Sequence, residues 1–262
     1  MKNSKKLEKS RGILAFAYNV DTIDYIAIAK KTLALAGQKL NLPYTLITDK
    51  ELSNEWSNLR YDIDSKKFIQ WRNVGRHNAY ELSPYEETLV IDVDYLILDN
   101  NLNKIFETDW DYLLSRESIS VTDDWPSTMG ETSLPYIWAT VFAFRKSARS
   151  EMFFSLVGKI QRNYPYYSAL FNVRERNFRN DYAFAMADII LNGYNLEKKS
   201  IPGKIIAINR PISKIYCKDN QIIVKDADRS YILPITNLHI MSKAYLQSDD
   251  CKHFIDNILN ES

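Results

Sequence analysis

Apolar and polar positions follow two different periods along the first part of the chain. Residues 12–18 form a continuous apolar run, which is typical of a strand buried on both faces of a parallel sheet. An apolar stripe at helical spacing then extends from Ile26 to Leu40, and a second apolar strand follows Pro43. Strand, helix and strand in this order predict a βαβ unit with a right-handed crossover.

The middle of the chain continues this alternation. The pattern predicts helices over 66–82, 147–163 and 180–191, strands over 88–91, 112–114 and 138–144, and a polar loop over 122–135. Strands that alternate with helices predict an α/β fold, with a mostly parallel central sheet flanked by helices.

Beyond Pro202 the pattern changes to short strands. They are predicted over 205–208, 215–217, 222–224 and 231–233, with Lys218-Asp219-Asn220 as a hairpin turn between two of them. An amphipathic helix over 250–259 closes the chain. The C-terminal part is therefore predicted to be small and β-rich.

Length and composition indicate one large globular domain, because the chain has 262 residues, of which 45% are apolar. The basic stretch 1–11 superficially resembles a signal peptide, but the apolar run after it is short and leads directly into a helical pattern. We expect a disordered basic tail over 1–11 and a single domain over 12–262. No apolar run approaches the roughly 20 residues that cross a bilayer, so we expect a cytoplasmic protein without a membrane partner.

Charge and motif content argue against several classes of function. Lys and Arg number 34 against 33 Asp and Glu, so bulk positive charge does not hold this protein on nucleic acid, although a local basic patch is compatible with that balance. The sequence has no Gly-rich phosphate loop and no Gly-x-Ser-x-Gly elbow, which argues against P-loop kinases, dehydrogenases and serine hydrolases. Cys217 and Cys251 stand far apart and match no metal-ligand spacing, so we expect two reduced thiols.

The most informative motif is Asp92-Val93-Asp94, which follows an apolar strand directly. Ligands of open α/β sheets bind at the carboxyl ends of strands. Two carboxylates there repel each other and are costly to desolvate, whereas a hard divalent cation between them stabilises both. Mg²⁺ or Mn²⁺ held in this way bridges to the oxygens of a diphosphate. The alternative is a pair of solvated acids in a turn.

His239 and Lys243 lie far downstream and four residues apart. An imidazole can complete the metal shell, because Mn²⁺ accepts mixed nitrogen and oxygen ligands. Lys243 would reach the same diphosphate as a compact point charge. The alternative is a half-exposed histidine on a strand and a surface lysine.

Arginines form two further groups. Arg72 and Arg76 are four residues apart and would share one face of the predicted helix, where the alternative is a solvated face. Arg174, Arg176 and Arg179 precede Asn180-Asp181, with Tyr164, Tyr166, Tyr167 and Phe171 nearby. This second group would hold an anionic acceptor such as a DNA backbone, or it is a loop anchored by aromatics with its charges facing water.

Taken in order, these motifs resemble the nucleotide-sugar glycosyltransferases of the GT-A fold, especially the family 8-like branch. The resemblance implies a Rossmann-like sheet, with a nucleotide-binding half at about 12–100 and an acceptor half at about 101–262. It also implies the following roles: Ala17, Tyr18 and Asn19 at the base and ribose, Arg76 and Lys243 at the diphosphate, Asp92, Asp94 and His239 at the metal, and Asp181 on the acceptor side. UDP is the expected base. The strand Trp138-Ala139-Thr140-Val141-Phe142 lacks the family's Asn-x-Gly glycine, and no glycine accompanies His239 and Lys243.

Longer phrases, such as AYELSPYEETLVIDVDYLI and YIWATVFAFRKS, resemble glycosyltransferase-like proteins of tailed bacteriophages. That resemblance implies a phage origin, and hence the host cytoplasm. It also implies an acceptor that is either DNA bearing hydroxymethylated pyrimidines or a glycan or protein.

The sequence hypothesis is therefore a Mn²⁺- or Mg²⁺-dependent transfer of a sugar from a nucleotide diphosphate sugar to an acceptor hydroxyl. Asp181 is the preferred general base or acceptor-positioning carboxylate, with a helix N-cap as its alternative role, and Asp124 in the loop 123–126 is the second candidate. Two alternatives remain open. One is a non-catalytic nucleotide- or DNA-binding module of the same fold, and the other is a nucleotidyltransferase.

Overall fold

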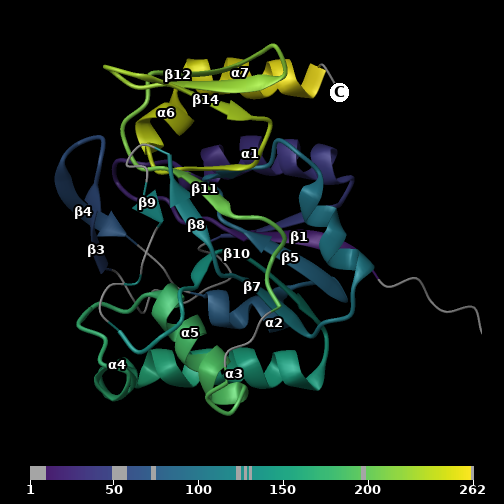
Figure 1. Ribbon diagram of the computed structural model, residues 1–262, viewed down its shortest axis with the longest axis vertical. Helices are drawn as coiled ribbons and strands as arrows, with labels where there is room; N and C mark the ends of the chain where they lie inside the picture. Colours follow the sequence, from purple (N-terminus) through teal and green to yellow (C-terminus); the bar gives the residue numbers. More distant parts are fainter. Residues whose placement is uncertain are drawn as a thin grey trace, which may run out of the picture.

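A five-stranded sheet with the strand order β2-β1-β5-β10-β7 lies at the centre of the computed structural model, which describes residues 10–48, 58–71, 75–121, 125–126, 129, 132–195 and 199–260 (Figure 1). Its strands are β1 (Arg11–Phe16), β2 (Tyr44–Ile47), β5 (Glu87–Ile91), β7 (Tyr112–Ser115) and β10 (Trp138–Arg145). β1 pairs in parallel with β2 and β5, while β10 is antiparallel to both β5 and β7. The sheet therefore has one reversed strand, and the predicted α/β class is confirmed.

Helices cover both faces of this sheet, as the continuous apolar strands predicted. α1 (Tyr25–Leu40) and α7 (Asp249–Asn260) lie on one side, and α2 (Ala79–Leu82), α3 (Ala148–Arg162) and α5 (Asn180–Leu191) lie on the other (Figure 1). Alternate residues of β1 and β5 enter two separate cores: Ile13 and Leu89 pack with α1, and Leu14 and Val90 pack with α3 and α5. Both faces of these strands are thus buried.

A second sheet, of order β6-β15-β11-β8-β9, brings the C-terminal part of the chain to the end of β5. It consists of β6 (Tyr95–Leu96), β8 (Ser118–Ser120), β9 (Trp125–Pro126), β11 (Ile205–Ile208) and β15 (Leu238–Ile240). β15 is antiparallel to β6, so that His239 lies opposite Tyr95. Because Tyr95 follows Asp94 directly, this pairing places His239 beside the two aspartates.

The β-rich C-terminal part is also confirmed. β12 (Lys214–Lys218), β13 (Gln221–Lys225) and β14 (Ser230–Pro234) form an antiparallel meander, followed by α6 (Lys243–Gln247). The predicted turn between β12 and β13 has φ values of 51° at Asp219 and 60° at Asn220. Two consecutive left-handed residues in a two-residue loop are the signature of a type I′ hairpin.

The predicted helix over 66–82 is wrong in its first part. β3 (Asn58–Asp62) and β4 (Lys67–Trp71) form an antiparallel hairpin, followed by a short 3-10 turn η1 (Arg76–Asn78) and then α2. The segment 67–71 is rich in aromatic and β-branched residues, and its pairing with 58–62 favours strand over helix. Arg72 lies outside the described residues, and Arg76 is the first residue of the 3-10 turn η1.

Some features of the fold were not predicted, and others agree with the prediction. A 3-10 segment η2 (Asn101–Glu107) and a short helix α4 (Tyr164–Leu170) were not predicted. Residues 1–9 lie outside the described part, and Arg11 already belongs to β1, where its Nε lies 2.8 Å from Glu87 Oε2. Cys217 and Cys251 do not form a disulfide, as expected. None of the helices in the described residues is long and apolar enough to cross a membrane.

Candidate functional site

A cavity of about 440 Å³ opens where β1 and β5 end and β10 begins. Most of the residues expected at the site line this cavity: Ala17, Tyr18, Arg76, Asp92, Asp94, Asp181 and His239. Asn19 does not line it, because its Oδ1 accepts a hydrogen bond from the Ile26 amide at 2.9 Å in the first turn of α1. The Asn19 side chain therefore binds the start of α1, and its predicted contact with a ligand stays a prediction.

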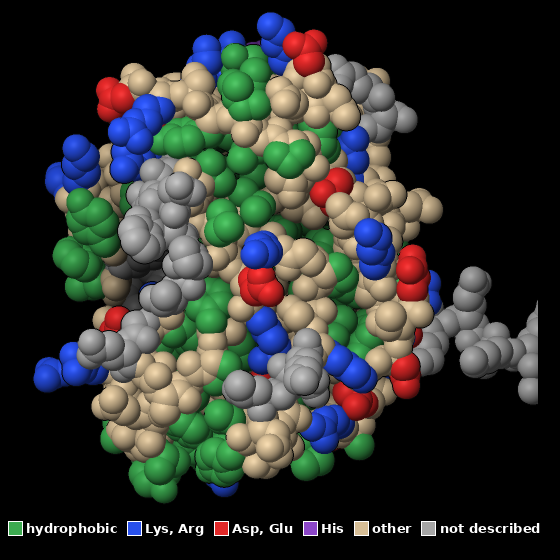
Figure 2. Space-filling view, in the orientation of Figure 1, with side chains coloured by type: hydrophobic (Ala, Val, Ile, Leu, Met, Phe, Trp, Pro, Cys, Tyr) green, Lys and Arg blue, Asp and Glu red, His purple; other side chains and the backbone are tan. Residues whose placement is uncertain are grey.

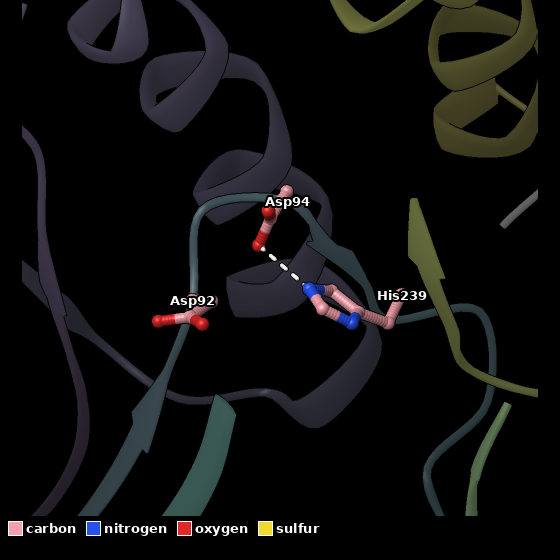
Figure 3. A group of neighbouring side chains, drawn as sticks. All are labelled: Asp92, Asp94 and His239. Atoms are coloured by element: carbon pink, nitrogen blue, oxygen red, sulfur yellow. Dashed lines mark ion pairs between the residues drawn. The ribbon is translucent and has the colours of Figure 1, made fainter. Parts of the chain in front are cut away.

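Asp92, Asp94 and His239 converge on one point of the cavity. One ligand atom from each lies within 4.8 Å of the others. Asp92 directly follows β5, Asp94 lies in a turn closed by the Tyr95 amide, and His239 comes from β15 (Figure 3). The Asp94 carboxylate points at the imidazole, with 3.3 Å between Asp94 Oδ1 and His239 Nε2. The side chains of Asp94 and His239 are buried, so neither matches the solvated alternative.

The donor set fits a divalent cation. Two carboxylates and one imidazole suit Mn²⁺, and the carboxylates alone suit Mg²⁺. Asp94 Oδ1 is buried and accepts no hydrogen bond from the described residues. A buried acceptor oxygen without a donor is costly, and coordination to a cation would satisfy it.

Lys243 completes the surroundings of Asp94. Its Nζ lies 2.7 Å from Asp94 Oδ2 and also donates to the backbone oxygens of Ile240 and Met241 at 3.1 and 3.0 Å. Burial by itself would raise the pKa of Asp94, but Lys243 and His239 outweigh that effect and hold the pKa well below its usual value. Lys243 therefore keeps Asp94 ionised in a buried place. Its predicted contact with a diphosphate stays a prediction.

Asp92 is held from two sides. Arg76 donates to Asp92 Oδ1, and Thr140 Oγ1 donates to Asp92 Oδ2 at 3.1 Å. Burial lowers the pKa of Arg76, while Asp181 and Asp94 oppose that shift. Arginine remains charged at any ordinary pH. The cavity thus carries a fixed positive charge beside the candidate metal ligands.

Asp181 lines the same cavity, in the first turn of α5. Its Oδ1 accepts a hydrogen bond from the Ala139 amide at 2.9 Å, and its Oδ2 lies 3.0 Å from Arg179 Nη2. The N-cap position of α5 is Arg179, so the alternative role of Asp181 as a cap is wrong. Asp181 instead raises the pKa of Arg179 and presents a paired carboxylate to the cavity.

Of the other expected residues, some lie at the rim of the cavity, some lie in the core, and Asp124 is not among the described residues. Arg174 and Arg176 are exposed, whereas Arg179 lines the cavity. Of the aromatics, Tyr164 and Phe171 are buried core residues and Tyr166 is 66% exposed. The arginine group is thus a rim segment with only one member in the cavity.

Sequence reasoning missed Thr140, Trp138 and one wall of the cavity. Trp138 packs edge-on against the His239 ring at 4.7 Å between centroids. Thr140 lies beside Asp92, because the Asp92 amide bonds to the Thr140 carbonyl across β5 and β10. Only knowledge of that strand pairing could have identified Thr140. The missed wall is made by the hairpin β3–β4, which contributes Leu59, Tyr61 and Phe68.

Comparison with known proteins gives solved structures only, since no family model and no curated protein sequence matches. The chain is similar to a glycosyltransferase involved in glycosylating the major capsid of PBCV-1, with 14% identity, a TM-score of 0.40 and coverage of 96% of this chain and 99% of that one. It is also similar to an active-site mutant of LgtC, with 12% identity, a TM-score of 0.45 and 95% coverage of both chains. GlyE of Streptococcus pneumoniae TIGR4 matches at 13% identity and a TM-score of 0.34, over 72% of this chain and 45% of that one. These similarities are loose, so the function proposed below rests on the geometry of the site.

Proposed function

We propose that this protein is a metal-dependent glycosyltransferase that uses a nucleoside diphosphate sugar. One observation carries the proposal: a buried carboxylate, Asp94, meets His239 and Lys243 beside Asp92, inside a cavity at the ends of the central strands. Two acids, an imidazole and neighbouring cations suit a metal-bound diphosphate leaving group. UDP is the expected nucleotide, and Mn²⁺ or Mg²⁺ is the expected ion.

Each residue then has a distinct task. Asp92, Asp94 and His239 would hold the cation, which supplies Lewis-acid stabilisation of the leaving diphosphate when bound. Lys243 keeps Asp94 ionised, and Arg76 adds fixed positive charge where negative charge develops on the departing oxygen. Ala17 and Tyr18 would meet the nucleoside at the end of β1.

The acceptor enters on the side of Asp181 and Arg179. Asp181 would position the attacking hydroxyl or take its proton, which requires it to lie within hydrogen-bond reach of that hydroxyl. Asp124 is the second carboxylate proposed for this side. The exposed Arg174 and Arg176 belong to the rim segment and suit an anionic acceptor, such as DNA with hydroxymethylated pyrimidines. A glycan or protein is the other acceptor class.

Thermal unfolding with Mn²⁺ and a nucleotide panel of UDP, GDP, CDP, ADP and the triphosphates tests the proposal. A ligand at about 100 times its dissociation constant adds about 2.7 kcal/mol to the free energy of unfolding. We expect a Mn²⁺-dependent stabilisation by one diphosphate that is lost in Asp92→Asn and kept in Asp256→Asn, an exposed carboxylate on α7. Absence of stabilisation by every nucleotide would contradict the proposal. Stabilisation by a triphosphate alone would favour the nucleotidyltransferase.

A further inference from the structure

The hairpin β3–β4 is held against the molecule by its turn and by one of its faces. Its strands pair only with each other among the described residues, and an isolated two-stranded hairpin is marginally stable. Ile69 packs against the main core from one face. In the turn, the Asp64 carboxylate accepts hydrogen bonds from Ser242 Oγ at 2.7 Å and from the Ala244 amide at 2.9 Å. Asp64 therefore ties the hairpin to the two residues that flank Lys243.

The other face of the hairpin exposes large apolar side chains to the cavity. Leu59 and Tyr61 lie two residues apart, and Phe68 lies opposite Tyr61 in register, so the three share one face. They are 63%, 49% and 70% exposed, respectively. All three line the cavity that contains Asp92 and Asp94. Figure 2 shows hydrophobic side chains gathered over β3 and β4 at the left edge of the molecule. Apolar side chains left open on a cavity wall indicate a ligand.

The position of the hairpin along the cavity identifies which part of a ligand it meets. The central strands place the end of β1, the end of β5 and the start of β10 side by side. Tyr61 lines a small gap together with Tyr25 and Ile23, which follow β1, so the hairpin lies at the β1 end. Asp92 stands at the end of β5, and Asp181 bonds to the start of β10. A diphosphate at Asp92 and Asp94 would have its nucleoside toward the hairpin and its sugar toward Asp181.

We propose that the hairpin face of Leu59, Tyr61 and Phe68 stacks on the nucleobase of the donor, with Asp64 as the residue that positions the hairpin. This inference rests on the proposed function. A flat base presents a π face that aromatic side chains bind whatever the base is. The same Asp64 links base recognition to Lys243, since Ser242 and Ala244 are its neighbours in the chain.

Isothermal calorimetry measures the affinity for UDP and for inorganic pyrophosphate, each in the presence of Mn²⁺. The comparison separates the contribution of the nucleoside from that of the diphosphate. Alanine substitution of a residue that stacks on a base lowers the affinity about five- to 150-fold. Phe68→Ala should weaken UDP by that factor and leave pyrophosphate unchanged. Phe68→Tyr should bind UDP like the wild type. The matched control is Ile232→Ala, because Ile232 is also exposed on a hairpin, at 62%, and lies outside the cavity.

A second variant tests the positioning residue. Asp64→Ala should weaken UDP binding, and the double variant Asp64→Ala/Phe68→Ala should lose no more than Phe68→Ala alone, because both changes remove the same stacking. Equal UDP affinity in Phe68→Ala and Ile232→Ala would overturn the inference, as would an equal loss for UDP and pyrophosphate. Failure of the wild type to bind either ligand with Mn²⁺ would instead overturn the proposed function and this inference with it.

Discussion

At the scale of single residues, the buried pair of Asp94 and Lys243 should have the largest effect on local stability. Two opposite charges that are buried away from water stabilise each other, because the loss of one leaves the other desolvated and unpaired. Lys243 has three donors, and Asp94 together with two backbone oxygens accepts from them. The pair is therefore needed for the stability of the folded site, apart from any role in catalysis.

Lys243→Met should lower the free energy of unfolding by about 3–5 kcal/mol, because Asp94 then stays buried without its cation. Urea denaturation measures this loss. The double variant Asp94→Asn/Lys243→Met should recover part of it, since the uncompensated charge is gone. Lys225→Met, at an exposed lysine of β13, is the control. Equal losses in Lys243→Met and Lys225→Met would contradict the buried pair.

The two thiols should differ strongly in reactivity. Cys251 is buried in α7, and burial raises its pKa to about 12, whereas Cys217 is exposed on β12. At pH 8 only about one in ten thousand Cys251 side chains is a thiolate. We expect Ellman's reagent to titrate one thiol in the native protein and two in urea. Rapid reaction of both thiols without denaturant would refute this.

At the scale of elements, strands followed by polar residues were predicted well, because their information is local. The apolar run before Asp92 predicted the strand β5, and so also predicted that Asp92 and Asp94 follow the end of a strand. The hairpin β3–β4 was missed because a local pattern does not show which strands pair. The pairing joins 58–62 with 67–71, and Asp64 bonds to Ser242, which lies 178 residues further along the chain. Thr140 was missed for the same reason. His239 and Lys243 were proposed from their side-chain chemistry and from the family resemblance, since the β15–β6 pairing that brings them to Asp94 cannot be read from the sequence.

The β12–β13 turn gives a prediction at this scale. Asn220 has a φ of 60°, which glycine adopts without strain and β-branched residues resist. Asn220→Gly should leave the melting temperature unchanged or raise it. Asn220→Ile should cost about 1–2 kcal/mol. Thermal melts of both variants measure the effect, and the opposite order of stability would refute the type I′ turn.

At the scale of the whole molecule, the site unites the two halves of the chain. Asp92 and Asp94 come from the first half, and His239 and Lys243 come from the second, through a sheet in which β6 pairs with β15. α7 packs on the same core as α1, although the two helices stand at opposite ends of the sequence (Figure 1). Residues of both halves of the chain thus pack together in the core around α1 and α7.

Unfolding should therefore be a single transition. Far-UV circular dichroism and tryptophan fluorescence should give the same urea midpoint, because Trp110 lies in the core shared by both halves and Trp138 contacts His239. Added Mn²⁺ with UDP should shift both curves together. Separate midpoints would show that the halves fold as independent domains.

The reversed strand β10 also bears on how such a protein can change over evolution. Its consecutive residues Ala139 and Thr140 bond to Asp181 and Asp92, respectively, so one central strand sets the spacing between these two carboxylates. The rim segment 174–179 lies outside that strand. Mutation can therefore vary this rim segment, while the separation of Asp92 and Asp181 is kept by the core strand.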